Sequence, residues 1–84
     1  MTVSLLHLET GCSLEFAASD IECVRAALEQ HYGIPKVDKS SPILTVYTFA
    51  NATIIFQNEW DDPCLIANEP MGVAMLEQLA KELA

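Results

Sequence analysis

Hydrophobic and polar residues alternate along several short segments of this chain, which is the pattern of a β-strand with one buried face. The clearest segment is 12–17 (CSLEFA), where alternate residues from Cys12 to Phe16 are apolar. A tight turn at 9–11 (ETG), with Gly11 free to take a positive φ, joins this strand to the one before it. The predicted strands are 3–9, 12–17, 43–49, 53–57 and 64–67.

Residues 20–32 have apolar positions three and four apart, which predicts an amphipathic helix. Ser19 and Glu22 fit a capping box, in which each side chain bonds the backbone amide of the other residue. Gly33 fits the position at which a helix ends, and Pro35 prevents its continuation. The predicted buried stripe is Ile21, Val24, Leu28 and Tyr32.

A second helix is predicted near the end of the chain, up to about Leu83. Asn68 or Glu69 is expected to cap it, and Pro70 suits its first turn. Gly72 falls on the buried stripe, where it would let the helix backbone approach the sheet closely. The rest of that stripe is Met75, Leu76, Leu79 and Leu83.

The predicted order is β-β-α-β-β-β-α, with residues 33–42 as a loop. Hairpins dominate the connections, and both helices need a sheet face to cover. We therefore expect an α+β fold: one mostly antiparallel sheet with two helices packed on one face. The 84 residues suffice for one core, so residues 1–84 are a single domain.

Two helices can cover one face of such a sheet but not both. Strict alternation nevertheless sends large apolar side chains to both faces. These side chains are Leu5, Leu6, Leu8, Leu44, Val46, Tyr47 and Ile55. A monomer rarely leaves such a patch in water, so we expect a homodimer through the sheet or a partner protein on it. The alternative is that loop 33–42 wraps over that face.

The net charge of the chain limits the kinds of molecule that it can bind. Twelve acidic residues oppose four basic ones, and the net charge of −8 would repel nucleic acids and anionic membranes. The cysteines, Cys12, Cys23 and Cys64, are odd in number, and the first residues lack the basic and apolar regions of a signal peptide. We therefore expect a cytoplasmic protein with free thiols, which binds another protein or itself.

The most distinctive stretch is 58–63 (NEWDDP), with the single tryptophan of the chain among carboxylates. A tryptophan in a connection can anchor a partner, and the acids around it suit a basic one. The alternative is that Trp60 folds back on the edge of the core. The candidate interaction residues are Glu59, Trp60, Asp61, Asp62 and Tyr47.

No motif for catalysis or for a cofactor stands out. The glycines are far apart, and no frame brings together a nucleophile, a base and an oxyanion hole. The acids near Trp60 lack the frame of a calcium loop, and the histidines and cysteines lack zinc spacing, so we expect neither metal nor cofactor. We interpret the chain as a non-catalytic interaction or regulatory module, of inhibitor or immunity type. The alternative is a small-molecule or metal-binding domain.

Overall fold

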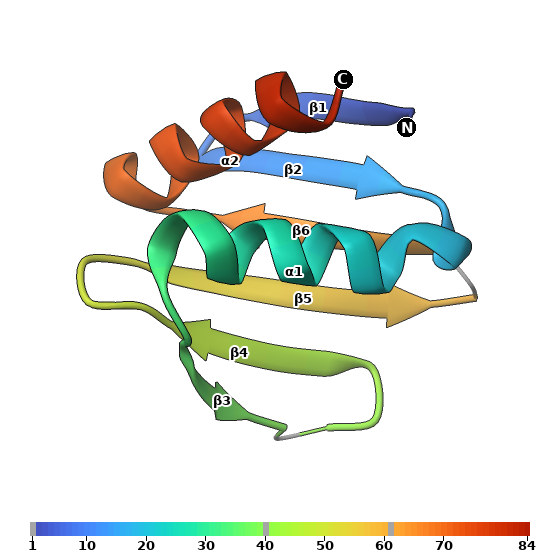
Figure 1. Cartoon of the computed structure of the whole chain (residues 1–84), viewed down its shortest axis with the longest axis horizontal. Helices are drawn as coiled ribbons and strands as arrows, with labels where there is room; N and C mark the ends of the chain where they lie inside the picture. The colour runs from blue at the N-terminus through green and yellow to red at the C-terminus, as the bar shows by residue number, and fades with distance from the viewer. Residues whose placement is uncertain (1, 40, 61) are drawn as a thin grey trace.

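The computed structural model describes residues 2–39, 41–60 and 62–84, which form a six-stranded sheet and two α-helices (Figure 1). The strands are β1 (Val3–Leu8), β2 (Gly11–Phe16), β3 (Lys36–Asp38), β4 (Leu44–Thr48), β5 (Thr53–Glu59) and β6 (Asp62–Ala67). The helices are α1 (Ile21–Tyr32), α2 (Pro70–Leu83) and a short 3-10 turn, η1 (Ala18–Asp20). No helix among these residues is long and apolar enough to span a lipid bilayer.

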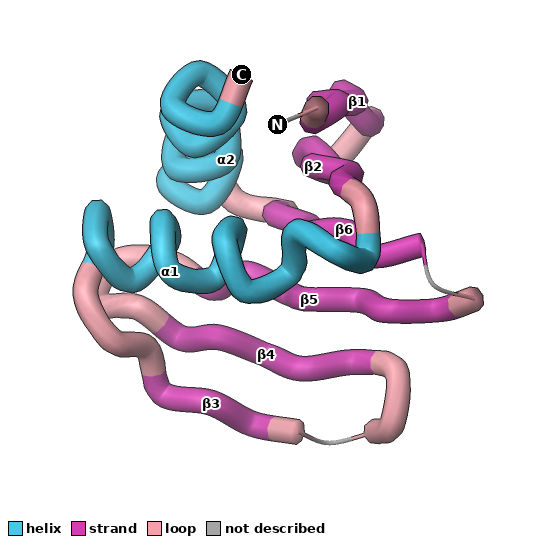
Figure 2. Tube along the Cα trace, turned by 45° about the vertical axis from the view of Figure 1, so that its right-hand side comes forward, coloured by secondary structure: helices cyan, strands magenta, loops and turns pink. Residues whose placement is uncertain are grey.

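The strand order is β1-β2-β6-β5-β4-β3, and every neighbouring pair is antiparallel. Both helices lie on the same face of this sheet (Figures 1 and 2). Helix α2 packs on β1, β2 and β6, while α1 runs along the neighbouring part of the sheet. The predicted α+β class, the antiparallel sheet and the two helices on one face are thus confirmed.

The structure adds one strand to the predicted order. β3 lies in segment 33–42, which the sequence analysis assigned to a loop. Its three residues pair with Val46, Tyr47 and Thr48 of β4. The strand therefore forms because β4 pairs with it, not because its own residues alternate between polar and apolar.

The start of α1 differs from the predicted capping box. Ser19 lies inside η1, is exposed, and the N-cap position belongs to Asp20, whose side chain makes no capping hydrogen bond. The Glu22 carboxylate pairs with the guanidinium of Arg25 instead of reaching back. The other end agrees with the sequence, since α1 ends at Gly33 with a φ of 87°.

Helix α2 begins as predicted, with Glu69 at the N-cap position and Pro70 in the first turn. The Glu69 side chain does not cap the helix, because its Oε1 accepts a 3.2 Å hydrogen bond from the backbone N–H of Thr53. Gly72 is buried, and a Cβ built there would lie 3.0 Å from the Cβ of Ala67. The glycine therefore allows the close approach of helix and sheet that the sequence predicted.

Gly11 has a different role from the predicted one. Its φ is not positive; among the described glycines only Gly33 has a positive φ. A Cβ at Gly11 would lie 1.8 Å from the carbonyl oxygen of Ala67 in β6. The position thus requires glycine because two backbones meet there, not because the turn is left-handed.

The core fills the space between the helices and one face of the sheet. Its side chains come from alternate positions of the central strands, from the β4–β5 connection and from the predicted stripe of each helix. They are Cys12, Leu14, Phe16, Val24, Leu28, Phe49, Ala52, Ile54, Leu65, Ala67, Met75, Leu76 and Leu79. The opposite face of the sheet, which we call the open face, carries no helix.

Candidate functional site

The β5–β6 connection forms a narrow tip at one end of the sheet (Figure 1). The register places Glu59 opposite Asp62, so the connection consists of residues 60–61. Trp60 is 92% exposed and therefore does not fold back on the core. Asp61, also predicted as an interaction residue, lies outside the described residues. We call Glu59, Trp60 and Asp62 the acidic tip.

The backbone of Trp60 is unusual as well as exposed. Its φ is 56°, the one positive φ among the described residues other than glycine. A bulky residue is disfavoured there because its Cβ crowds the backbone, and such a position costs about 1 kcal/mol or more. Glycine or asparagine is the usual residue in such a hairpin turn. The chain thus holds its only tryptophan where neither local folding nor burial favours it.

The two carboxylates of the acidic tip add a second unfavourable feature. Like charges directly opposite in an antiparallel pair repel each other, and Glu59 and Asp62 form such a pair. The Gln57 amide donates a 3.3 Å hydrogen bond to Glu59 Oε2, but it supplies no positive charge. A cation from another molecule would relieve the repulsion and could stack on the indole.

A third unfavourable feature lies one residue before the tip. The side-chain oxygen Oδ1 of Asn58 is buried and has no hydrogen-bond partner among the described residues. Leaving a buried acceptor unpaired costs about 1–3 kcal/mol. Three unfavourable features therefore coincide around Trp60.

The open face continues from the acidic tip across the sheet. The alternation that buries Leu65 turns its neighbours Cys64 and Ile66 to the open face. Cross-strand register then aligns a row of side chains through the middle of this face: the apolar Val46, Ile55 and Ile66, then the polar Ser13, then Leu6. Beside this row a shallow hollow of about 210 Å³ is lined by Thr53, Ile55, Ile66, Asn68 and Glu69.

Tyr47 lies away from the acidic tip, on the helix-covered face of β4. It is half-buried, and its ring centroid is 6.5 Å from that of Phe56. Burial raises the pKa of its hydroxyl; Arg25 lowers it, and Glu29 and Glu22 raise it. The structure therefore does not bring Tyr47 together with Glu59, Trp60 and Asp62.

An apolar hollow lies between α1 and the sheet, next to Tyr47. Its lining residues are Phe16, Ile21, Val24, Arg25, Leu28, Tyr47, Phe56 and Leu65. Its cavity volume is about 10 Å³, far below the roughly 300–1,000 Å³ of typical ligand pockets. Packing of the core accounts for this hollow, and we assign no ligand to it.

The cysteines occupy three different environments. Cys12 is buried in the core, Cys64 is half-buried on the open face, and Cys23 is exposed on α1. Burial raises the pKa of Cys12, with a further rise from Glu77. Burial also raises the pKa of Cys64, while a hydrogen bond with Ser13 lowers it and Glu15 and Asp62 raise it. Both thiols are therefore held in the neutral, unreactive form.

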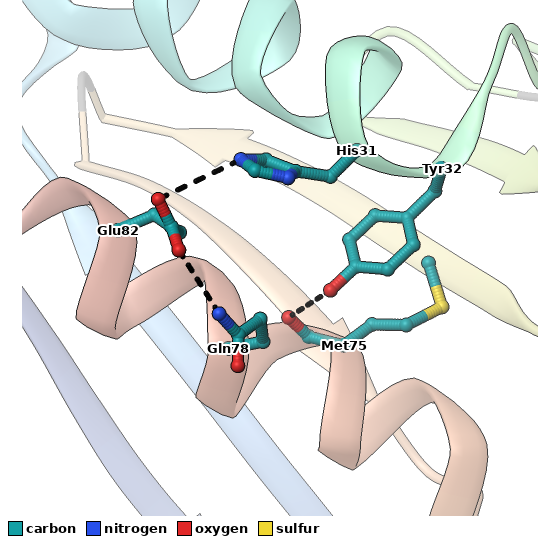
Figure 3. Close-up of polar contacts among 5 residues, drawn as sticks. All are labelled: His31, Tyr32, Met75, Gln78 and Glu82. Atoms are coloured by element: carbon teal, nitrogen blue, oxygen red, sulfur yellow. Dashed lines mark hydrogen bonds and ion pairs between the residues drawn. The ribbon is translucent and has the colours of Figure 1, made fainter.

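Polar contacts join the ends of the two helices above the core (Figure 3). His31 Nε2 lies 3.9 Å from Glu82 Oε2, and the Gln78 side chain donates a 3.0 Å hydrogen bond to Glu82 Oε1. The Tyr32 hydroxyl donates a 3.3 Å hydrogen bond to the carbonyl oxygen of Met75. Within the described residues, no three histidine, cysteine or acidic side chains gather as metal ligands would. The His31–Glu82 and Tyr32–Met75 contacts join α1 to α2, while the Gln78–Glu82 bond lies within α2.

Sequence reasoning identified the tip but missed Asn58 and Ile66. Period-two alternation in the last strand could have assigned Ile66 to the open face. The unpaired oxygen of Asn58 left no signal in the sequence, because it depends on the packing around the hairpin.

The chain matches no protein family, no curated protein and no solved structure.

Proposed function

We propose that this protein is a non-catalytic interaction module that binds a basic protein through its acidic tip. The observation that carries the proposal is Trp60, 92% exposed at a φ of 56° between opposed carboxylates. Strained residues persist where the surrounding structure enforces them, and they cluster at functional positions.

The partner is defined by its chemistry. An indole buries a large area at a small loss of side-chain entropy, so Trp60 would enter an apolar pocket. Lys or Arg side chains at the rim of that pocket would face Glu59 and Asp62 and remove their mutual repulsion. The adjoining open face supplies further apolar contact through Ile55 and Ile66.

The net charge of −8 supports the same choice of partner. It speeds encounter with a positively charged surface and opposes contact with nucleic acids and anionic lipids. A small acidic chain that covers a basic surface acts as a regulator, and an inhibitor or immunity-type protein is the simplest case. We place this activity in the cytoplasm, where three free thiols persist.

The test places a photo-cross-linking amino acid at position 60 in living cells. A matched control carries it at Ile34, which is 87% exposed and belongs to the connection between α1 and β3. That connection lies on the side of the molecule away from the β5–β6 connection (Figure 1). A protein captured at position 60 but not at position 34 is identified, purified and titrated by calorimetry. We expect a basic partner whose affinity falls as salt is added.

Variants of the purified chain then test the contact itself. Trp60→Ala should weaken binding by about 30-fold or more, as truncation of an aromatic hot spot does, while Ile34→Ala should have no effect. The double variant Glu59→Gln and Asp62→Asn should mainly lower the rate at which the protein associates with its partner. The proposal is wrong if no adduct is specific to position 60, if the captured protein is acidic, or if Trp60→Ala binds like the wild type.

A further inference from the structure

β1 forms one edge of the sheet, and its outer side is open. It pairs with β2 alone, and in Figure 2 no helix lies beyond it. An edge strand presents a row of unpaired N–H and C=O groups, which is a template for another strand. The outer side of β1 is therefore a main-chain binding surface.

The hairpin register shows which groups point outward. Leu8 and Gly11 flank the two-residue connection 9–10, and such flanking residues bond each other. Alternation then directs the amides of Leu6 and Ser4 toward β2. The amides of the residues between them, Val3, Leu5 and His7, point away from the sheet.

The two edges of the sheet are protected very differently. β3, at the other edge, has three residues, of which Lys36 and Asp38 are charged, and Pro35 precedes it. Short length, charge and proline are the usual means of blocking an edge. β1 has six residues without proline or carboxylate, and its pairing with β2 runs without a bulge.

The side chains of β1 match this open backbone. Leu6 and Leu8 are 46% and 49% exposed, and both lie on the open face. Leu6 ends the row that contains Val46, Ile55 and Ile66, with Ser13 between Leu6 and Ile66. An added strand would therefore extend an apolar surface as well as the main-chain ladder.

We infer that β1 pairs with β1 of a second copy of this chain, antiparallel about a two-fold axis. The occupant follows from charge and symmetry. Two copies with a net charge of −8 repel each other over most of their surface. β1 contains no Asp or Glu, so a contact between two β1 strands places no two carboxylates of these strands side by side. A two-fold contact also requires a self-complementary patch, and β1 can form one because it is an edge strand without carboxylates that carries Leu5, Leu6 and Leu8.

The two-fold axis passes beside Leu6, so that this residue faces its own copy. The outward amides of Leu5 and His7 then bond across the axis, while Leu6 forms a non-hydrogen-bonded pair, in which side chains are closest. Ser4 of one copy faces Leu8 of the other. This contact lies three strands away from β5 and is independent of the acidic tip.

Sedimentation equilibrium of the full chain tests the association. We expect a monomer–dimer equilibrium that added salt strengthens, because salt screens the repulsion between acidic copies. Leu6→Lys should raise the dissociation constant by about tenfold or more, because two ammonium groups would then meet at the axis. The matched control is Val37→Lys on β3, the blocked edge. Val37 is 49% exposed in the wild type, and the Val37→Lys variant should dimerise as the wild type does.

Cross-linking tests the register in a Cys23→Ser background, which removes the exposed thiol. Non-hydrogen-bonded partners have Cα atoms about 4.5 Å apart, within disulfide range, so Leu6→Cys should oxidise to a covalent dimer. Leu8→Cys should not, because Leu8 faces Ser4. If Leu6→Lys fails to fold, hydrogen exchange of the backbone amides in the wild type tests the contact instead. The protection of Leu5 and His7 should rise with protein concentration.

A wild type that stays monomeric at every concentration and salt would overturn the inference. A dimer unaffected by folded Leu6→Lys would overturn the β1 contact, and cross-linking of Leu8→Cys but not Leu6→Cys would overturn the register. Failure of Trp60→Ala to alter partner binding would bear on the proposed function alone.

Discussion

The hydroxyl of Tyr32, in the last turn of α1, donates a 3.3 Å hydrogen bond to the carbonyl oxygen of Met75 in α2 (Figure 3). This bond joins residues from the two helices across the top of the core. We expect Tyr32→Phe to lower the free energy of unfolding by about 1 kcal/mol, measured by urea denaturation. Tyr47→Phe is the control, since that hydroxyl has no hydrogen-bond partner among the described residues. An equal loss in both variants would show that this bond does not stabilise the fold.

Leu79→Ala should be much more destabilising. Leu79 is fully buried between α2 and the sheet, so its truncation loses burial and leaves a cavity, with a cost of about 2–5 kcal/mol. Met71→Ala on the same helix is the control, because Met71 is 53% exposed and should change stability little. A small effect of Leu79→Ala in urea denaturation would contradict the assigned inner face of α2.

Ser19→Ala should change the free energy of unfolding by less than about 0.5 kcal/mol. Its hydroxyl is exposed in η1 and caps no helix. A loss of about 1 kcal/mol, as expected for removal of a real cap, would instead support the capping box read from the sequence.

Stability should fall above pH 9.0, the ordinary pKa of a thiol. Burial raises the pKa of Cys12 and Cys64, and also of Tyr32 and Tyr47, whose ordinary value is 10.0. As the pH rises, these groups therefore lose their protons at a lower pH in the unfolded chain than in the folded protein. The free energy of unfolding is thus highest below pH 9.0 and falls as the pH rises toward the pKa values of the folded state. Urea midpoints measured across this pH range test the decline. A flat profile up to about pH 10 would contradict this prediction.

Trp60→Asn should stabilise the free protein by about 0.5–1 kcal/mol, because asparagine tolerates a positive φ far better than tryptophan does. The same change should abolish binding of the partner. Ile34→Asn also removes an exposed apolar side chain but without positive φ, so its urea midpoint should not rise. A gain in both variants would show that removal of an exposed apolar side chain, rather than relief of backbone strain, stabilises the protein.

The helices and the core were predictable because their signals are local. Gly33 and Pro70 mark helix ends, and the spacing of Leu76 and Leu79 marks the buried face of α2. The class of fold follows, since amphipathic helices and hairpins leave few ways to bury their apolar faces.

The failures share a dependence on distant parts of the chain. β3 exists because β4 offers it an edge, and Gly11 is required because Ala67 lies against it. Alternation correctly separated Tyr47 from Val46, but it could not show which of them faces the helices. The strain at Trp60 is equally invisible, because a sequence does not state the sign of φ.

The blocked edge at β3 has a consequence for the size of any assembly. A unit with two open edges can add neighbours without limit, and the product is a fibre. In the dimer inferred above, Lys36 and Asp38 would block the other edge, so each chain would offer a single open edge and act as a monovalent unit. Growth through the backbone ladder would then terminate at the first addition, whatever the concentration.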